Sequence, residues 1–158
     1  MSNIILEKAS LVVDFAIARG KELKLLPLTV AVLDSGGHLV AFKRDNGSGI
    51  LRPDIAIGKA WASLGMGIPS RKVRDNLSDR PTFLNSLSVA SGGRFIPVPG
   101  GVLIKDKNNC IIGAVGISGD TSDKDEYCAI EGVKAAGLIP QPKEPSPGWK
   151  NSTLGPKS

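Results

Sequence analysis

The spacing of apolar residues in the first 20 positions is typical of a helix with one buried face. That face comprises Ile5, Ala9, Val12, Val13, Ala16 and Ile17. The helix is predicted to end near Gly20, because glycine is common where helices stop. Similar spacing, with proline or capping residues at the start, predicts four more helices, over 53–64, 70–77, 81–91 and 121–137.

Between these helices lie short runs rich in β-branched and other apolar residues, bounded by turn residues. They predict five strands, over 28–33, 38–43, 95–98, 102–105 and 110–117. The connecting turns are short, which favours hairpins and antiparallel pairs. The run 111–117 is apolar on both faces, so helices are expected on both sides of the sheet. The pattern therefore predicts an α+β fold of three layers, α/β/α, with a five-stranded and largely antiparallel sheet.

The chain changes character near residue 140. Five of its eleven prolines lie at positions 140, 142, 145, 147 and 156. Such a segment is expected to be extended, because proline removes a backbone donor and fixes φ. We therefore predict one domain over residues 1–139, followed by an extended C-terminal arm over 140–158.

Charge and composition narrow the class of function. The net charge is +5, and only 4% of the residues are aromatic. The basic excess is divided between residues 71–80 and the arm, and few rings are available for base stacking, so no nucleic-acid partner is expected. No apolar run approaches the roughly 20 residues of a membrane span. We expect a cytoplasmic protein without a membrane partner.

Two cysteines and one histidine cannot complete a tetrahedral zinc site without carboxylates or a second subunit. No metal site is therefore predicted. Both cysteines, Cys110 and Cys128, are interpreted as small apolar residues rather than nucleophiles.

Three turns contain paired glycines, which expose backbone N–H donors and let a ligand approach closely. They cover residues 34–38, 91–94 and 97–101. Each is also explained by turn formation alone. Acidic residues crowd the start of the last predicted helix, where they act as helix-capping groups or as pocket acceptors; Asp125 and Glu126 are the candidates for the latter role.

Three side chains stand out beside these turns. His38 is the only histidine, and it is either a turn or interface residue or a functional one. Lys59 lies in a helical stretch of small residues and either extends along the surface or reaches into a pocket. Arg94 follows a glycine pair, and it is equally well explained as a surface residue or as a partner for a carboxylate.

Four ordered segments together resemble the GlcG/HbpS family, a heme-binding or "heme-degrading" group that also occurs at the carboxyl end of some PduO corrinoid adenosyltransferases. The segments are VLDSGGHLVAFKRDNG (32–47), DIAIGKAWAS (54–63), SGGRFIPVPGGVLIKD (91–106) and IIGAVGISGDTSDKDE (111–126). The resemblance implies a profilin-like fold, homo-oligomers and a ligand pocket near a subunit contact. It nominates as pocket residues Lys59, Gly92, Gly93, Arg94, Pro99, Gly100, Gly101, Asp125 and Glu126.

Three functional hypotheses follow. The leading one is an oligomeric small-molecule-binding protein of the GlcG/HbpS type, with heme or another tetrapyrrole as ligand and His38 as the candidate axial ligand. The alternative is a cofactor-independent enzyme on a small oxygenated metabolite, with Lys59 and Glu126 as acid and base and Arg94 holding a carboxylate. The third is an assembly or partner-binding module that uses the arm and Trp149.

Overall fold

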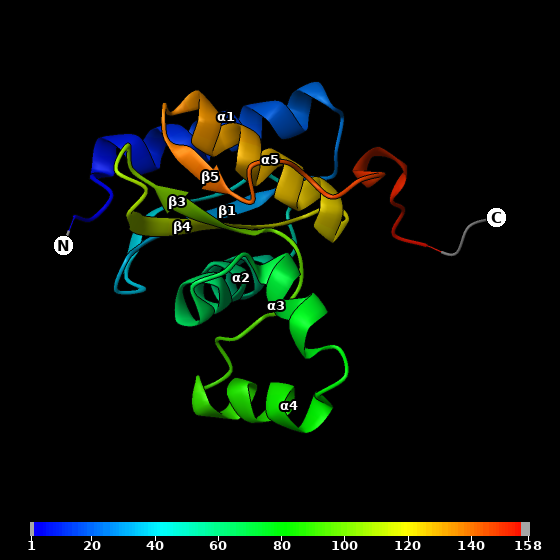
Figure 1. The fold of residues 1–158 in the computed structure, drawn as a ribbon. Coiled ribbons are helices and arrows are strands. Elements are labelled where there is room, and N and C mark those ends of the chain that lie inside the picture. The colour runs from blue at the N-terminus through cyan, green and yellow to red at the C-terminus, as the bar shows by residue number, and fades with distance from the viewer. Residues whose placement is uncertain (1, 156–158) are drawn as a thin grey trace.

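The computed structural model describes residues 2–155 (Figure 1). In chain order its elements are α1 (Leu6–Glu22), β1 (Thr29–Asp34), β2 (Leu39–Arg44), α2 (Arg52–Met66), α3 (Ser70–Leu77), α4 (Pro81–Ala90), β3 (Gly101–Lys105), β4 (Ile111–Ser118), α5 (Ser122–Ala135), β5 (Ile139–Gln141) and a short 3-10 turn at Trp149–Asn151.

The strands form one sheet in the order β2-β1-β4-β3-β5, and every neighbouring pair is antiparallel. In the register, Thr29 lies opposite Ser118, and Gly101 lies opposite Gly116. The start of β1, the start of β3 and the end of β4 therefore meet at one end of the sheet. The candidate residues at 99–101 and at the start of α5 lie at this end.

Helices cover both faces of the sheet. Helices α1 and α5 pack on one face, and α2 packs on the other across β1, β4 and β3. Figure 1 shows α3 and then α4 progressively farther from the sheet, on the α2 side. The three-layer α+β class with a five-stranded antiparallel sheet, predicted from the sequence, is confirmed.

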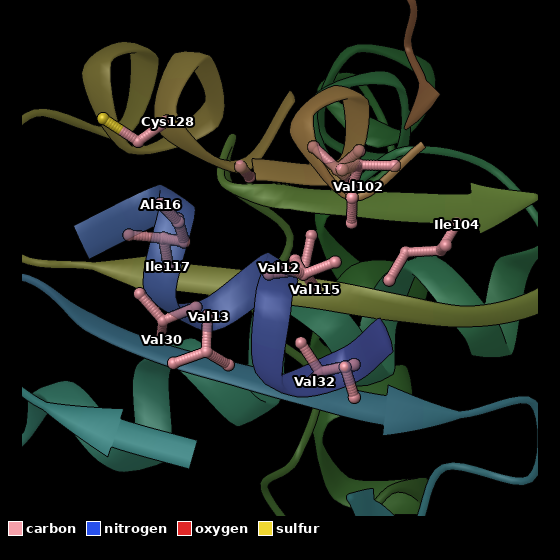
Figure 2. Close-up of a cluster of buried hydrophobic side chains, with 14 of the residues drawn as sticks. Val12, Val13, Ala16, Val30, Val32, Val102, Ile104, Val115, Ile117 and Cys128 are labelled. Atoms are coloured by element: carbon pink, nitrogen blue, oxygen red, sulfur yellow. The ribbon is translucent and has the colours of Figure 1, made fainter. Parts of the chain in front are cut away.

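The larger apolar core lies between the sheet and helices α1 and α5. Figure 2 shows Val115 and Ile117 of β4 beside valines from α1 and β1. On the opposite face, Ala114 of β4 packs with Leu33, Leu103 and Ala60. Because both faces are buried, β4 carries apolar side chains in consecutive positions.

Helix α2 approaches the sheet unusually closely, because glycines face it from two strands. A methyl group on Gly116 would overlap the carbonyl oxygen of Ala56, and one on Gly101 would overlap that of Lys59. The small residues of α2, which the sequence shows around Lys59, make this contact possible. The approach fixes where the Lys59 side chain leaves the helix.

The predicted strand over Phe95–Val98 is wrong. Pro97 and Pro99 have no backbone N–H, and the intervening Val98 donates its N–H to Ile96 in a tight turn. The N–H of Ile96 binds the carbonyl of Gly58, so this segment follows α2 instead of the sheet.

The fifth strand is instead β5, which pairs with β3 at the sheet edge and includes Pro140, a residue placed by sequence in the arm. The division into a domain over 1–139 and an arm over 140–158 stays a prediction. Positions 156–158 of the arm lie outside the described residues. Helix α1 also continues two residues past Gly20, to Glu22.

Candidate functional site

A buried ion pair joins α2 to α5 around the end of the sheet. The Lys59 side chain passes beside Gly100, whose φ of +121° and lack of a side chain leave room for it. Its Nζ donates to the carbonyl of Ile117 at 2.8 Å and to Oδ2 of Asp125 at 3.1 Å. The side chains of Lys59 and Asp125 are only 2% and 1% exposed.

The first turn of α5 holds Asp125 in position. Thr121 caps the helix by accepting from the N–H of Lys124, as the sequence indicated. Oδ1 of Asp125 accepts from the N–H of Asp120 at 3.0 Å. Burial raises the pKa of Asp125 to about 6, against the opposing effect of Lys59. Burial lowers the pKa of Lys59, again against its partner.

A second charged pair lies next to the first. The carboxylate of Glu126 is fully buried, and its Oε2 accepts from Nε of Arg71 at 3.1 Å. Its Oε1 accepts from the N–H of Ser146 at 3.2 Å. Burial raises the pKa of Glu126, and Arg71 opposes that shift. Arg71, on α3, is a functional-site neighbour that sequence reasoning missed.

The structure thus brings Lys59, Gly100, Gly101, Asp125 and Glu126 to one end of the sheet, with Pro99 buried directly before them. The two residues predicted as an acid–base pair, Lys59 and Glu126, bind different partners and are both closed to solvent. Their arrangement is that of charged groups paired within the fold.

The other candidates lie on an open surface. Gly92 and Gly93 end α4 with φ of +65° and +84°, and open space surrounds both. Arg94 is exposed; its Nε donates to the carbonyl of Ser91 at 2.8 Å, and its guanidinium lies 4.8 Å from the ring centre of Trp61. The terminal nitrogens of Arg94 are therefore presented beside an aromatic ring.

The turn that carries His38 lies against Trp61, since a methyl group on Gly37 would be 3.2 Å from the indole nitrogen. Ser35, Gly36 and Gly37 from its turn, together with residues of α2 including Trp61, line a cavity of about 140 Å³. Trp61 links this cavity to Arg94, although the sequence analysis did not select it. The sequence did contain a signal for Trp61, because a tryptophan is unusual in a chain with few aromatic residues and this one lies two positions from Lys59.

The turn orients the His38 ring. Nδ1 lies 3.1 and 3.2 Å from the two oxygens of Asp34, and 80% of the side chain is exposed. Partial burial raises the pKa of Asp34, but the N–H groups of His38 and Gly36 and the His38 ring together have the larger effect, so the pKa lies below its usual range. An ionised Asp34 accepts Nδ1–H and leaves Nε2 as a free acceptor at the surface.

A second turn has the same backbone design. Asp106 accepts from the N–H groups of Asn108 and Cys110, as Asp34 does from Gly36 and His38. Cys110 therefore occupies the position equivalent to His38, and it is exposed. Cys128 is buried, which raises the pKa of its thiol to about 12.

Within residues 2–155, no three His, Cys, Asp or Glu side chains gather where they would hold a metal ion. The same stretch contains no helix that is both long and apolar enough to span a membrane.

The sequence profile of a family described as "Haem degrading protein HbpS-like" matches residues 4–134. No curated protein matches the chain significantly. Among solved structures, a PduOC:heme complex has a TM-score of 0.76 at 21% identity, covering 86% of this chain and 96% of that one.

Two other solved structures have a similar fold. Protein ORFY of Klebsiella pneumoniae has a TM-score of 0.77 at 24% identity, covering 87% of this chain and 92% of its own. A double mutant of HbpS from Streptomyces reticuli has a TM-score of 0.73 at 21% identity, covering 85% and 87% respectively. At these identities, the likeness establishes the shared fold.

Proposed function

Because the chain belongs to the HbpS-like family, we propose that it binds a small molecule and that this ligand is heme or another tetrapyrrole. The observation that carries the proposal is the exposed imidazole of His38, held by Asp34 with Nε2 directed away from the carboxylate. A ligating histidine commonly donates its other ring N–H to a carboxylate in this way. One solved structure of the same fold is a heme complex.

Residues beside the turn of His38 suit a tetrapyrrole, because Trp61 lines the same cavity as Gly36 and Gly37. When bound, heme would supply an iron that an imidazole can ligate and propionates that a guanidinium can bind. Arg94 offers two terminal nitrogens for a carboxylate, and Trp61 offers an aromatic surface beside them. In this proposal, His38 would hold the iron and Arg94 would hold a propionate, and Gly92 and Gly93 leave the approach to Arg94 open.

The size of the cavity bears on the oligomeric state. Its volume of about 140 Å³ is below the roughly 300–1,000 Å³ typical of small-molecule pockets. The cavity therefore accommodates part of a tetrapyrrole. We propose that a second copy of the chain covers the rest, so that the protein acts as a homo-oligomer, and that it does so in the cytoplasm.

The enzyme alternative has less support. It requires Lys59 and Glu126 to exchange protons with a substrate, but both side chains are buried and paired within the fold. Arg94, its proposed carboxylate binder, stacks on Trp61 at the open surface.

Titration of heme into the protein tests the proposal. We expect the Soret band to shift at micromolar protein, and Arg94→Ala to weaken binding about tenfold, because a charge-assisted hydrogen bond is worth about 1.5–3 kcal/mol and this one is exposed. Arg80→Ala is the matched control, since Arg80 lies 4.6 Å from the ring centre of Phe83. An unshifted Soret band in the wild type overturns the proposal.

A further inference from the structure

The turn after β2 places an asparagine and a glycine side by side at the surface. The N–H of Ser48 donates to the carbonyl of Asp45 at 3.1 Å, which closes the turn. Gly47, the third of its four residues, has a φ of +83°, a conformation that glycine adopts without strain. Asn46 and Gly47 are both exposed, and they lie outside the candidate site. Because asparagine is one of the chemically labile residues, the surroundings of its amide decide whether it reacts.

The backbone nitrogen of Gly47 is available as a nucleophile. In asparagine deamidation, the nitrogen of the following residue attacks Cγ of the side-chain amide and closes a five-membered imide. A hydrogen bond from that nitrogen restrains it, and a side chain on the following residue hinders its approach; glycine has no side chain. Within residues 2–155, neither the N–H of Gly47 nor the side-chain amide of Asn46 makes a hydrogen bond to the protein. Both obstacles are therefore absent at this pair.

The other asparagines in the described part of the chain are protected by the backbone that follows them. Asn108 is the nearest parallel, because it is also exposed in a turn, but the N–H of Asn109 donates to the carbonyl of Asp106 at 3.0 Å. The remaining ones lie inside helices α3 and α4 or precede an N–H that has an acceptor: Asn3, Asn76, Asn85, Asn109 and Asn151. Among the asparagines of residues 2–155, Asn46 alone precedes an N–H without an acceptor in the protein.

We propose that Asn46 is a site of spontaneous deamidation, where the chain's own backbone is the nucleophile and water is the only co-reactant. The nitrogen of Gly47 bonds to Cγ of Asn46, and the bond between Cγ and the amide nitrogen breaks. Ammonia leaves with the proton that the nitrogen of Gly47 gives up. Water then opens the imide at either carbonyl carbon, so that position 46 becomes aspartate or isoaspartate.

The modification changes the charge of the turn. Each product places a new carboxylate next to Asp45, whose own carboxylate lies 3.4 Å from Nζ of Lys21. Isoaspartate also adds one main-chain atom between positions 46 and 47, inside the turn that the N–H of Ser48 closes. The hydroxyl of Ser48 is buried 2.7 Å from that of Thr29, at the start of β1. The modified turn is therefore one that is attached to the sheet.

The test incubates the full chain for several weeks at body temperature and mildly alkaline pH. We expect a more acidic form to appear on ion-exchange chromatography, and peptide mass spectrometry should locate the change from amide to acid at position 46. A protein isoaspartyl methyltransferase with a labelled methyl donor should modify the incubated protein and not the fresh protein. These readouts do not involve heme, so their outcome is independent of the heme-binding proposal.

Two glutamine variants separate Asn46 from the other asparagines. Asn46→Gln lengthens the side chain by one methylene, which disfavours closure of the imide, and the acidic form should be lost. Its circular dichroism spectrum should match that of the wild type, because Asn46 is exposed. Asn108→Gln is the matched control and should form the acidic product as the wild type does. An incubated wild type without the acidic form, or an acidic form that persists in Asn46→Gln, overturns the proposal.

Discussion

Asp125→Asn is expected to lower the free energy of unfolding by about 3–5 kcal/mol, because it leaves the buried ammonium of Lys59 without its countercharge. The side chain keeps its shape but has one oxygen in place of two, so its amide nitrogen faces a donor in either orientation: Nζ of Lys59, or the N–H of Asp120. Lys59 keeps the carbonyl of Ile117 but has no charged partner there. Denaturant unfolding followed by circular dichroism measures the loss.

The neighbouring acid provides the control. Asp123 lies in the same helix turn as Asp125 but is less buried. Asp123→Asn should therefore lower the free energy of unfolding by only about 0.3–1 kcal/mol. The double variant Lys59→Met with Asp125→Leu removes both charges and should recover at least half of the loss, because apolar replacements of buried pairs are often neutral. A double variant as unstable as the sum of its single changes contradicts the account of the pair.

Gly116→Ala is expected to cost more than about 4 kcal/mol and to leave little folded protein at 25 °C. The added methyl group would overlap the backbone oxygen of Ala56 and lie 2.9 Å from the backbone nitrogen of Ala60. Neither atom moves unless α2 shifts away from the sheet, and that shift would also displace Lys59 from Asp125.

Gly65→Ala is the matched control, within α2 itself. A methyl group there makes an ordinary 3.5 Å contact with the Trp61 ring, and alanine favours helix over glycine by about 1 kcal/mol. Gly65→Ala should therefore unfold at the wild-type temperature or above it in a thermal melt. Comparable melting temperatures for the Gly116→Ala and wild-type proteins would refute the close approach of α2.

The helices were predictable because local signals define them. Proline at the start and glycine at the end set α2 and α4, and apolar spacing set α1. Ile5 is an exception: it fits the apolar spacing of α1 but precedes the helix and is 59% exposed. Its position at the helix boundary removes it from the buried face.

Strand β5 was missed for a physical reason. It has three residues, one of them proline, and it exists because β3 offers a free edge. The apolar run at 95–98 has the composition of a strand, but two prolines at 97 and 99 deprive it of donors. Composition shows which residues are apolar, but whether they form a strand depends on a neighbouring strand edge with which they can pair.

The candidate site was predictable only in part. The family resemblance nominated Lys59, Gly100 and Asp125 for one pocket, and these three residues lie together in the structure. Gly92, Gly93 and Arg94, nominated with them, lie instead on an open surface. Arg71 was missed because 55 positions separate it from Glu126, and no spacing rule links them. Asp34 could have been identified from the sequence, because it lies only four residues before His38 in the same turn.

The central claim is that His38 is the residue through which this protein binds heme, and the spectrum of the heme-loaded His38→Ala variant tests it most directly. The Soret shift seen with the wild type should be lost, or heme affinity should fall at least about tenfold. Cys110→Ala changes the equivalent position of the matching turn, and it should retain the wild-type spectrum and affinity. A His38→Ala variant with the wild-type Soret band and affinity would contradict the assignment.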